Sequence, residues 1–289
     1  MNEKLSKKVL MAAISLATLV LAGCLLTNCG INDSDNTTNL NFLAQKYEEQ
    51  EIMDFKINPS THLDIHISAG SINIKESPDK KFHLIFTKKS TNKEHLKQLN
   101  VSIDQYDSIL SLKSTWKSST YQNCSVNCDI LIPSPVNQIT TKISTGSIKI
   151  EGIMAQIDAS NRAGSIYISQ KNGPQPNINA HASSGSITVE NASGEVNAKT
   201  KSGSIKITQQ LSMQKPVSTQ TYSGSIKIKH AGGNVKAETK SGSIYLSLQN
   251  IHGLIKTKTS SGGIHILDSN GRTVMKKHNG SVSIPANNK

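Results

Sequence analysis

The stretch Val217-Ser-Thr-Gln-Thr-Tyr-Ser-Gly-Ser-Ile-Lys-Ile228 decides the fold of this chain. Apolar or small residues alternate with polar ones on both sides of a central Ser-Gly-Ser. An alternation with a period of two predicts two short strands, each with one buried face. Gly224 lies between them, and glycine is the residue that turns a backbone sharply without strain. The stretch therefore predicts two strands joined at a corner.

The same phrase, or a close variant, occurs eight times between residues 139 and 284. The corner glycines are Gly146, Gly164, Gly185, Gly203, Gly224, Gly242, Gly262 and Gly280, at spacings of 18, 21, 18, 21, 18, 20 and 18 residues. An aliphatic residue follows two positions after each glycine, in a series from Ile148 to Val282. A fixed period of this length is typical of stacked repeats.

One repeat has too little apolar surface to fold alone. Copies stacked about 4.8 Å apart would place each aliphatic residue over the next and form a continuous core. The sequence therefore predicts an all-β fold, in which residues 139–289 form a parallel β-solenoid (β-helix) of repeats of 18–21 residues. The extra residues of the longer copies, near 169–174 and 209–212, are expected to form side loops.

The first residues resemble a bacterial export signal. Three lysines precede an apolar run over residues 9–21, which is short for a membrane span, so residues 1–23 are predicted to be a signal peptide. The run ends in Leu21-Ala22-Gly23-Cys24, which resembles the lipobox of bacterial lipoproteins. By this resemblance Cys24 becomes the acylated first residue of the mature chain, with palmitate as an acyl group. The alternative is an uncleaved signal anchor.

Two segments precede the repeats. Residues 24–51 are rich in polar side chains and are predicted to be a flexible tether between the lipid and the folded part. Residues 52–138 contain strand-like runs without a regular repeat, and include the early copy Ser68-Ala69-Gly70-Ser71-Ile72. A solenoid exposes an open edge at each end, so this segment is expected to be an N-terminal β cap. At the other end, Lys276, Lys277 and His278 are expected to discourage edge-to-edge pairing.

These features together resemble a known family. An exported chain with an early strand block, Leu131-Ile132-Pro133 and repeated Ser-Gly-Ser-Ile-x-Ile is similar to the DUF4097 family of bacterial β-strand-repeat proteins, known as putative adhesins. The resemblance covers residues 60–284. It implies the architecture and a cell-envelope location. Leu25, directly after the cysteine, resembles the residue found at this position in lipoproteins that are sorted to the outer membrane. It supplies no catalytic residues and no cofactor.

The charge is strongly positive and unevenly distributed. The whole chain has a formal charge of +12, and residues 139–289 hold 18 Lys and Arg against 6 Asp and Glu. A positively charged outer surface favours anionic partners such as lipid headgroups, envelope polymers or host glycans. The alternative is that lysine only keeps the strands soluble. Nucleic acid is not expected, because aromatic residues that could stack on bases make up only 4%. The candidate ligand face comprises Lys149, Tyr167, Lys206, Tyr222, Lys227 and Tyr245.

Two other side-chain groups are candidates for chemistry. Cys124 and Cys128 are predicted to form a disulfide through a loop or bulge, because four residues of extended strand span about 13 Å, beyond disulfide reach. A free thiol or a bond to Cys29 is the alternative. His62, Asp64 and His66 share one strand face and could hold a metal, but solvent-facing polar residues are commoner, so no metal is predicted.

These observations favour a non-catalytic, lipid-anchored envelope protein that binds polymers or surfaces, or has a structural role, through its basic outer face. A role as an accessory in envelope-stress signalling is the alternative. A β-helix polysaccharide lyase or hydrolase is less expected, because paired acidic residues are required and the repeats hold six acids in different columns or distant copies. The oligomeric state is not predicted.

Overall fold

The structure, a computed structural model, describes residues 47–58, 60–116, 124–213, 215–250 and 252–285. The predicted signal peptide, Cys24, Cys29 and the tether as far as residue 46 lie outside these ranges. Within them no helix is long and apolar enough to cross a membrane. The single helix there is α1 (Lys93–Gln98), whose first turn is capped by the side chain of Asn92.

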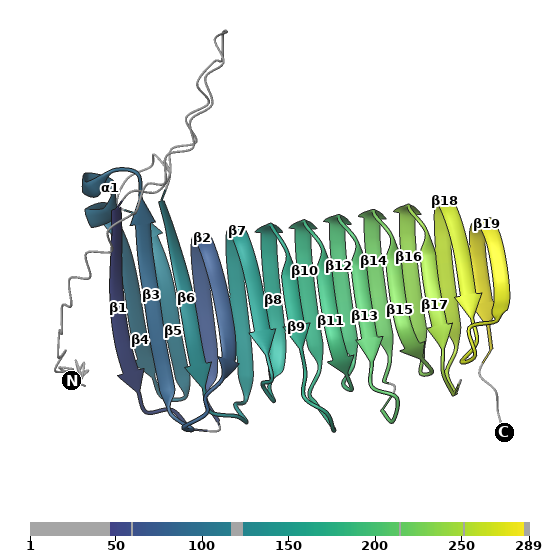
Figure 1. The fold of residues 1–289 in the computed structure, drawn as a ribbon, viewed down its shortest axis with the longest axis horizontal. Coiled ribbons are helices and arrows are strands. Elements are labelled where there is room, and N and C mark those ends of the chain that lie inside the picture. Colours follow the sequence, from purple (N-terminus) through teal and green to yellow (C-terminus); the bar gives the residue numbers. More distant parts are fainter. Residues whose placement is uncertain (1–46, 59, 117–123, 214, 251, 286–289) are drawn as a thin grey trace, which may run out of the picture. The chain divides into compact units, whose positions relative to one another are not determined.

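Nearly all the remaining regular structure is strand (Figure 1). The strands are β1 (Tyr47–Phe55), β2 (His62–Glu76), β3 (Phe82–Ser90), β4 (Leu99–Tyr106), β5 (Ile109–Trp116), β6 (Cys124–Ile132), β7 (Gln138–Glu151), β8 (Gln156–Ala163), β9 (Ile166–Ser169), β10 (Ile178–Ser184), β11 (Ile187–Ala192), β12 (Val196–Ser202), β13 (Ile205–Gln209), β14 (Val217–Ser223), β15 (Ile226–Ala231), β16 (Val235–Ser241), β17 (Ile244–Leu248), β18 (Ile255–Leu267) and β19 (Thr273–Ile284).

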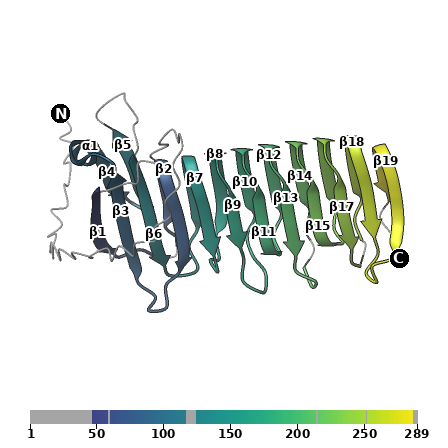
Figure 2. The same ribbon diagram turned by 45° about the horizontal axis from the view of Figure 1, so that its top comes forward.

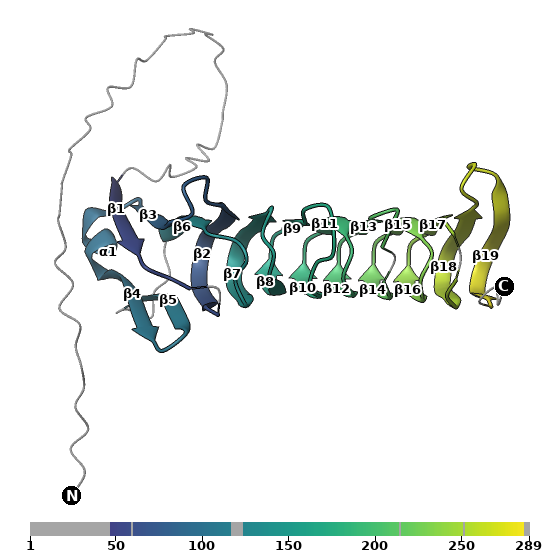
Figure 3. The ribbon, with the colours of Figure 1, turned by 90° about the horizontal axis from the view of Figure 1, so that it is seen from below.

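Each repeat forms one rung with a first strand, a glycine corner and a second strand. The first strands β8, β10, β12, β14 and β16 pair in parallel, and the second strands β9, β11, β13, β15 and β17 do the same. The long strands β2, β7 and β18 continue through the corner and contribute to both layers. Figure 3 shows the two layers from below. The predicted parallel β-solenoid is confirmed.

The core lies between the two layers. Equivalent residues pair from rung to rung, so that Ile205 lies over Ile187 and below Ile226. All three are at most 1% exposed. The first strands contribute smaller residues, such as Ala198 and Thr219, to the opposite wall of the core. Each rung is therefore buried mainly by its neighbours, as the aligned columns of the sequence predict.

The corner requires glycine for two reasons. Gly203 has a φ of +140°, and a Cβ added there would lie 2.2 Å from the carbonyl oxygen of Gly185 in the preceding rung. The same close approach recurs along the column, for example between Gly224 and Gly203. A side chain would therefore clash with backbone that cannot move without separating the rungs.

The side loops lie where the spacing of the glycines predicts them. Residues 170–177 connect β9 to β10, and residues 210–216 connect β13 to β14 (Figure 2). The Gln210 amide nitrogen donates to the carbonyl oxygens of Lys171 and Asn191, at 2.7 and 2.8 Å, and its amide oxygen accepts from Gly173 N at 2.9 Å. One buried side chain thus ties both loops to the stack.

The stack begins earlier than residue 139. Strand β2 pairs with β7 through a complete register that places Gly70 beside Gly146 and Ile72 beside Ile148. The early copy of the phrase therefore forms a rung directly beside β7. Strands β3 to β6, inserted in the sequence between β2 and β7, extend the layers on the other side of β2, where β5 and β6 pair in parallel with its two halves. Strand β1 extends the second layer beyond this insertion, so residues 47–51, assigned to the tether, belong to a strand.

The last copy of the phrase is not a parallel rung. Strand β19 runs antiparallel to β18, which places Val282 beside Thr257 in the first layer instead of over Ile264. The reason lies in the turn at residues 268–272, where the Asp268 carboxylate accepts from the backbone N–H groups of Asn270 and Arg272. An aspartate whose carboxylate accepts hydrogen bonds from backbone N–H groups later in the chain stabilises a tight turn, and the chain returns as a hairpin.

The predicted disulfide between Cys124 and Cys128 is wrong. Both residues lie in β6, which pairs with β3 in an unbroken register, Cys128 beside Phe86 and Cys124 beside Ser90. The required loop or bulge is absent from this described strand, and Cys128 is a free buried thiol. Burial raises the pKa of the Cys128 thiol to about 12, so it is neutral and unreactive.

Candidate functional site

The solenoid offers two outer faces. We call the outward residues of β8, β10, β12, β14 and β16, with the first halves of β2, β7 and β18, the first-strand face. The outward residues of β9, β11, β13, β15 and β17, with the second halves of the same three long strands, form the second-strand face. Because the core lies between the layers, the two faces point away from each other.

Five of the six predicted ligand residues lie in one ladder on the second-strand face. Lys149 pairs with Tyr167, and Lys206 pairs with Lys227, which pairs with Tyr245. Thr188 fills the position between Tyr167 and Lys206. The ladder continues to His265, whose ring stacks on Tyr245 with centroids 5.0 Å apart.

Two glutamates, Glu151 and Glu190, neutralise lysines in the first part of this ladder. The sequence does not predict these ion pairs. The Glu151 carboxylate lies 3.0 Å from Lys149 Nζ and 3.4 Å from Lys75 Nζ. Burial alone would raise the pKa of Glu151, but these two ammonium groups hold it below its usual value. Glu190 accepts from Tyr167 Oη and from Lys206 Nζ, and both hydrogen bonds lower its pKa.

The state of these two carboxylates bears on catalysis. A glycosidase needs one carboxylic acid with a raised pKa to protonate the leaving group. The pKa values of Glu151 and Glu190 are both lowered, because lysines and a tyrosine stabilise the ionised forms. Neither group is therefore suited to act as that general acid.

Tyr222 does not join the other five candidates, because it lies on the first-strand face. Tyr222 is 59% exposed, and Lys240 Nζ lies over its ring at 4.3 Å from the centroid. In the register of the first strands, Tyr222 of β14 lies between Lys201 of β12 and Lys240 of β16. These residues form a basic and aromatic ladder close to the corner.

The first-strand face is the more strongly basic of the two. Its last four rungs, from β12 to β18, carry six lysines and one glutamate, Glu238. The lysines are Lys199, Lys201, Lys236, Lys240, Lys256 and Lys258. Lys236 and Lys256 are directly paired across β16 and β18, so two like charges lie side by side. Such pairs destabilise a sheet.

Two shallow hollows follow one another along this face. One, of about 380 Å³, is lined by residues that include His66, Lys142 and His181. The other, of about 600 Å³, is lined by Lys236, Lys256 and several asparagines. Asn179, Asn197 and Lys199 line both hollows. The face therefore offers an elongated depression with amide and ammonium groups along its wall, together with the carboxylates of Asp158 and Glu195.

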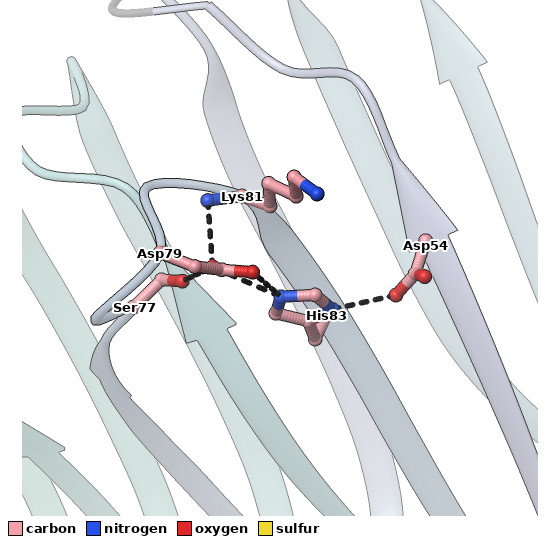
Figure 4. A network of polar contacts seen from close by, with 5 residues as sticks. All are labelled: Asp54, Ser77, Asp79, Lys81 and His83. Atoms are coloured by element: carbon pink, nitrogen blue, oxygen red, sulfur yellow. Dashed lines mark hydrogen bonds and ion pairs between the residues drawn. The ribbon is translucent and has the colours of Figure 1, made fainter.

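A further polar cluster lies in the N-terminal part of the fold, between β1, β3 and the turn before β3 (Figure 4). His83 Nδ1 lies 2.7 Å from the Asp54 carboxylate, and His83 Nε2 lies 2.9 Å from that of Asp79. Asp54 and Asp79 raise the pKa of His83, because the protonated ring can donate to both. Ser77 and the backbone N–H of Lys81 donate to Asp79 and hold its pKa well below the usual range.

The geometry of this cluster indicates a structural role and not a catalytic one. In a Ser–His–Asp triad the serine hydroxyl is hydrogen-bonded to the histidine. Here the Ser77 hydroxyl donates to Asp79 instead, so His83 cannot activate it. His83 joins β1 to β3 and to the turn that precedes β3. The cluster therefore fastens the edge strand β1 to the rest of the fold.

The histidines of β2 also have local partners. His62 Nε2 lies 2.9 Å from the Thr140 hydroxyl, and His66 Nε2 lies 3.2 Å from the Asp64 carboxylate. Within the ranges that the structure describes, no three His, Cys, Asp or Glu side chains are grouped to hold a metal ion.

The two-layered parallel stack defines a repeat protein of the β-solenoid class. The chain belongs to the Toastrack DUF4097 family, whose family model matches residues 60–289. The solved structure of a putative adhesin from Bacteroides fragilis has a TM-score of 0.50 and 18% identity, over 76% of this chain and 97% of that one. A putative adhesin from Parabacteroides merdae has a TM-score of 0.43 and 12% identity, over 77% and 96%. No curated protein matches the sequence.

Proposed function

We propose that this protein is a non-catalytic, lipid-anchored component of the bacterial cell envelope that binds anionic polymers. The first-strand face is the binding surface in this proposal. The observation that carries it is the excess of six lysines over one glutamate on four consecutive rungs, beside an elongated depression. Tyr222, exposed on the same face, supplies an aromatic surface for a sugar ring.

The charge pattern supports a polymer rather than a small ligand. Lys236 and Lys256 lie on adjacent rungs, which are about 4.8 Å apart. Lys236 pairs with Glu238 at 3.4 Å, and an anion that bridges rungs would relieve the repulsion that remains. A linear polyanion can place several charges along such a row. On the second-strand face, Glu151 and Glu190 already satisfy Lys149 and Lys206. Of the candidate ladder there, Lys227 and Tyr245 remain for a ligand.

The membrane attachment in this proposal rests on the lipobox. Acylation of Cys24 would hold the chain at a membrane, with the outer membrane as the expected address, because two acyl chains give stable attachment. Growth with labelled palmitate tests it, and label should enter the wild-type chain but not Cys24→Ser. Equal labelling of the variant would exclude this anchor.

The binding proposal is tested with the full chain in detergent micelles and with lipopolysaccharide and lipoteichoic acid as separate probes. We expect one of them to bind at low salt and to dissociate as salt rises, because exposed charges are screened. The double variant Lys199→Gln/Lys256→Gln removes two lysines that line the larger hollow. It should weaken binding by about 2 kcal/mol, or about thirtyfold, if each lysine contributes about 1 kcal/mol.

A matched control distinguishes this face from net charge alone. Lys149→Gln/Lys206→Gln removes the same charge from the second-strand face, where both lysines are already paired with glutamates. We expect less than about a twofold change in affinity there. Equal losses in the two variants, or no binding of either probe at low salt, would exclude the first-strand face as the binding surface.

A further inference from the structure

At each end of the stack, the last strand of the second layer pairs on one side only. These two edge strands carry opposite charges. Within the described ranges, β1 pairs with β3 alone and β19 pairs with β18 alone. Figure 1 shows these strands at opposite ends of the molecule. A strand with one unpaired edge is a template for pairing with another chain.

The N-terminal edge is acidic. Strand β1 is Tyr-Glu-Glu-Gln-Glu-Ile-Met-Asp-Phe, with four carboxylates in nine residues. Glu48 and Glu49 keep 55% and 52% of their side chains exposed, although each lies near a lysine of β3. Ile52, in the second half of the strand, is 67% exposed. Helix α1 lies beside the beginning of β1 (Figure 1), and the exposure of Ile52 shows that the outer face of β1 is uncovered in its second half.

The C-terminal edge is basic. The first half of β19, which pairs with the second half of β18, contains Lys276, Lys277 and His278. Arg272 directly precedes β19. All of these residues are exposed. Val274 and Met275 beside them are 49% and 39% exposed. This half of β19 therefore combines positive charge with uncovered apolar surface.

The two edges belong to the same layer and have compatible directions. Strand β1 is antiparallel to β3, β3 is antiparallel to β6, and β6 is parallel to β2. Strand β1 thus runs in the direction of the second strands, whereas β19 runs against it. A second copy placed in line would bring its β1 antiparallel to β19 of the first, with acidic residues facing basic ones.

We propose that the protein assembles head to tail, with β19 of one copy pairing with β1 of the next in the second layer. The contact uses a different surface at each end, so it is heterologous and continues beyond a dimer. Pairing of β19 with another β19 would oppose the lysines to each other. Lys276 and Lys277 therefore discourage symmetric pairing and favour pairing with β1.

Sedimentation velocity of the full chain in detergent, at about 20 mM and about 500 mM salt, tests this assembly. We expect species larger than a dimer that grow with protein concentration at low salt and dissociate at high salt. Lys276→Glu/Lys277→Glu should be monomeric at low salt, and so should Glu48→Lys/Glu49→Lys. An equimolar mixture of these two variants should assemble again, because each acidic edge then meets a basic one.

The control is Lys256→Glu/Lys258→Glu, which makes the same change of net charge on the first-strand face and should assemble like the wild type. Residues 276 and 277 are exposed, so their reversal should leave the fold intact, as circular dichroism will show. A wild-type chain that stays monomeric at low salt overturns the proposal. Assembly that stops at a dimer overturns it as well, and so does a reversed β19 that still assembles.

Discussion

The hydroxyl of Thr200 donates a hydrogen bond of 3.0 Å to the carbonyl oxygen of Gly185, the corner glycine of the preceding rung. Thr221, Thr239 and Thr259 make the same contact with the glycines before them, at 2.9 to 3.0 Å. In an earlier rung the amide of Asn161 donates to Gly146 at 2.7 Å. The buried threonine column thus satisfies carbonyl groups that the sharp corner would otherwise leave unpaired.

The rung that contains β10 lacks this contact and offers a stabilising substitution. Ala182 occupies the equivalent position next to Gly164 and has no hydroxyl. Ala182→Thr should add the missing hydrogen bond and raise the free energy of unfolding by about 1 kcal/mol. Chemical denaturation followed by circular dichroism measures the change.

The matched control is Ala180→Thr, one inward position earlier in the same strand. In that column the hydroxyls of Thr141 and Thr257 are buried without a hydrogen-bond partner among the described residues. A new hydroxyl there should therefore destabilise the chain or leave its stability unchanged. Equal stabilisation by both substitutions would show that the corner hydrogen bond is not the cause.

The corner glycines should be intolerant of any side chain. Gly203→Ala should lower the unfolding free energy by about 3 kcal/mol or more, because the new Cβ adds overpacking to backbone strain. Gly173 also has positive φ, of +103°, but a Cβ there meets no atom within 4 Å. Gly173→Ala should therefore cost only about 1 kcal/mol, from strain alone. Thermal unfolding of both variants checks the difference, and similar midpoints would contradict the close approach of the rungs.

The edge strand β1 should become less protected as pH rises. The folded pKa of His83 is raised by Asp54 and Asp79, so its stabilising contribution is complete below the unfolded value near 6.5 and is lost as pH rises through the folded value. The pKa of Asp79 is lowered, so its contribution is present above the unfolded value near 3.8 and persists into acid.

Hydrogen exchange of the β1 amides between about pH 5 and pH 9, corrected for the intrinsic rates, measures this loss. His83→Gln keeps a polar side chain but cannot become charged, so it should show lower protection with no step in this range. Protection that is independent of pH in the wild type would mean that His83 does not fasten β1.

Cys128 should resist alkylation in the folded protein. Its thiol is buried, and the pKa of about 12 leaves almost no thiolate at pH 8. Peptide mass spectrometry after iodoacetamide treatment should find Cys128 unmodified in buffer and modified in denaturant. Rapid modification of Cys128 in the native chain would contradict the burial of this face of β6.

The sequence by itself determined the solenoid. Ile187, Ile205 and Ile226 occupy one aligned column, and a residue that recurs at a fixed place in each repeat can be buried only if the repeats stack. The corner glycines and the side loops were predictable for the same reason, because each depends on a local, repeated pattern. The family resemblance also followed from these repeated residues.

Only the tertiary structure decided how the stack begins and ends. The insertion between β2 and β7 could not be read from the repeat, since the register of Gly70 with Gly146 joins residues separated by the whole insertion. The reversal of β19 depends on a turn that leaves the repeat spacing unchanged. Likewise, Glu151 pairs with Lys75 and Glu190 pairs with Lys206 of neighbouring rungs, and such pairs exist only once the rungs lie side by side.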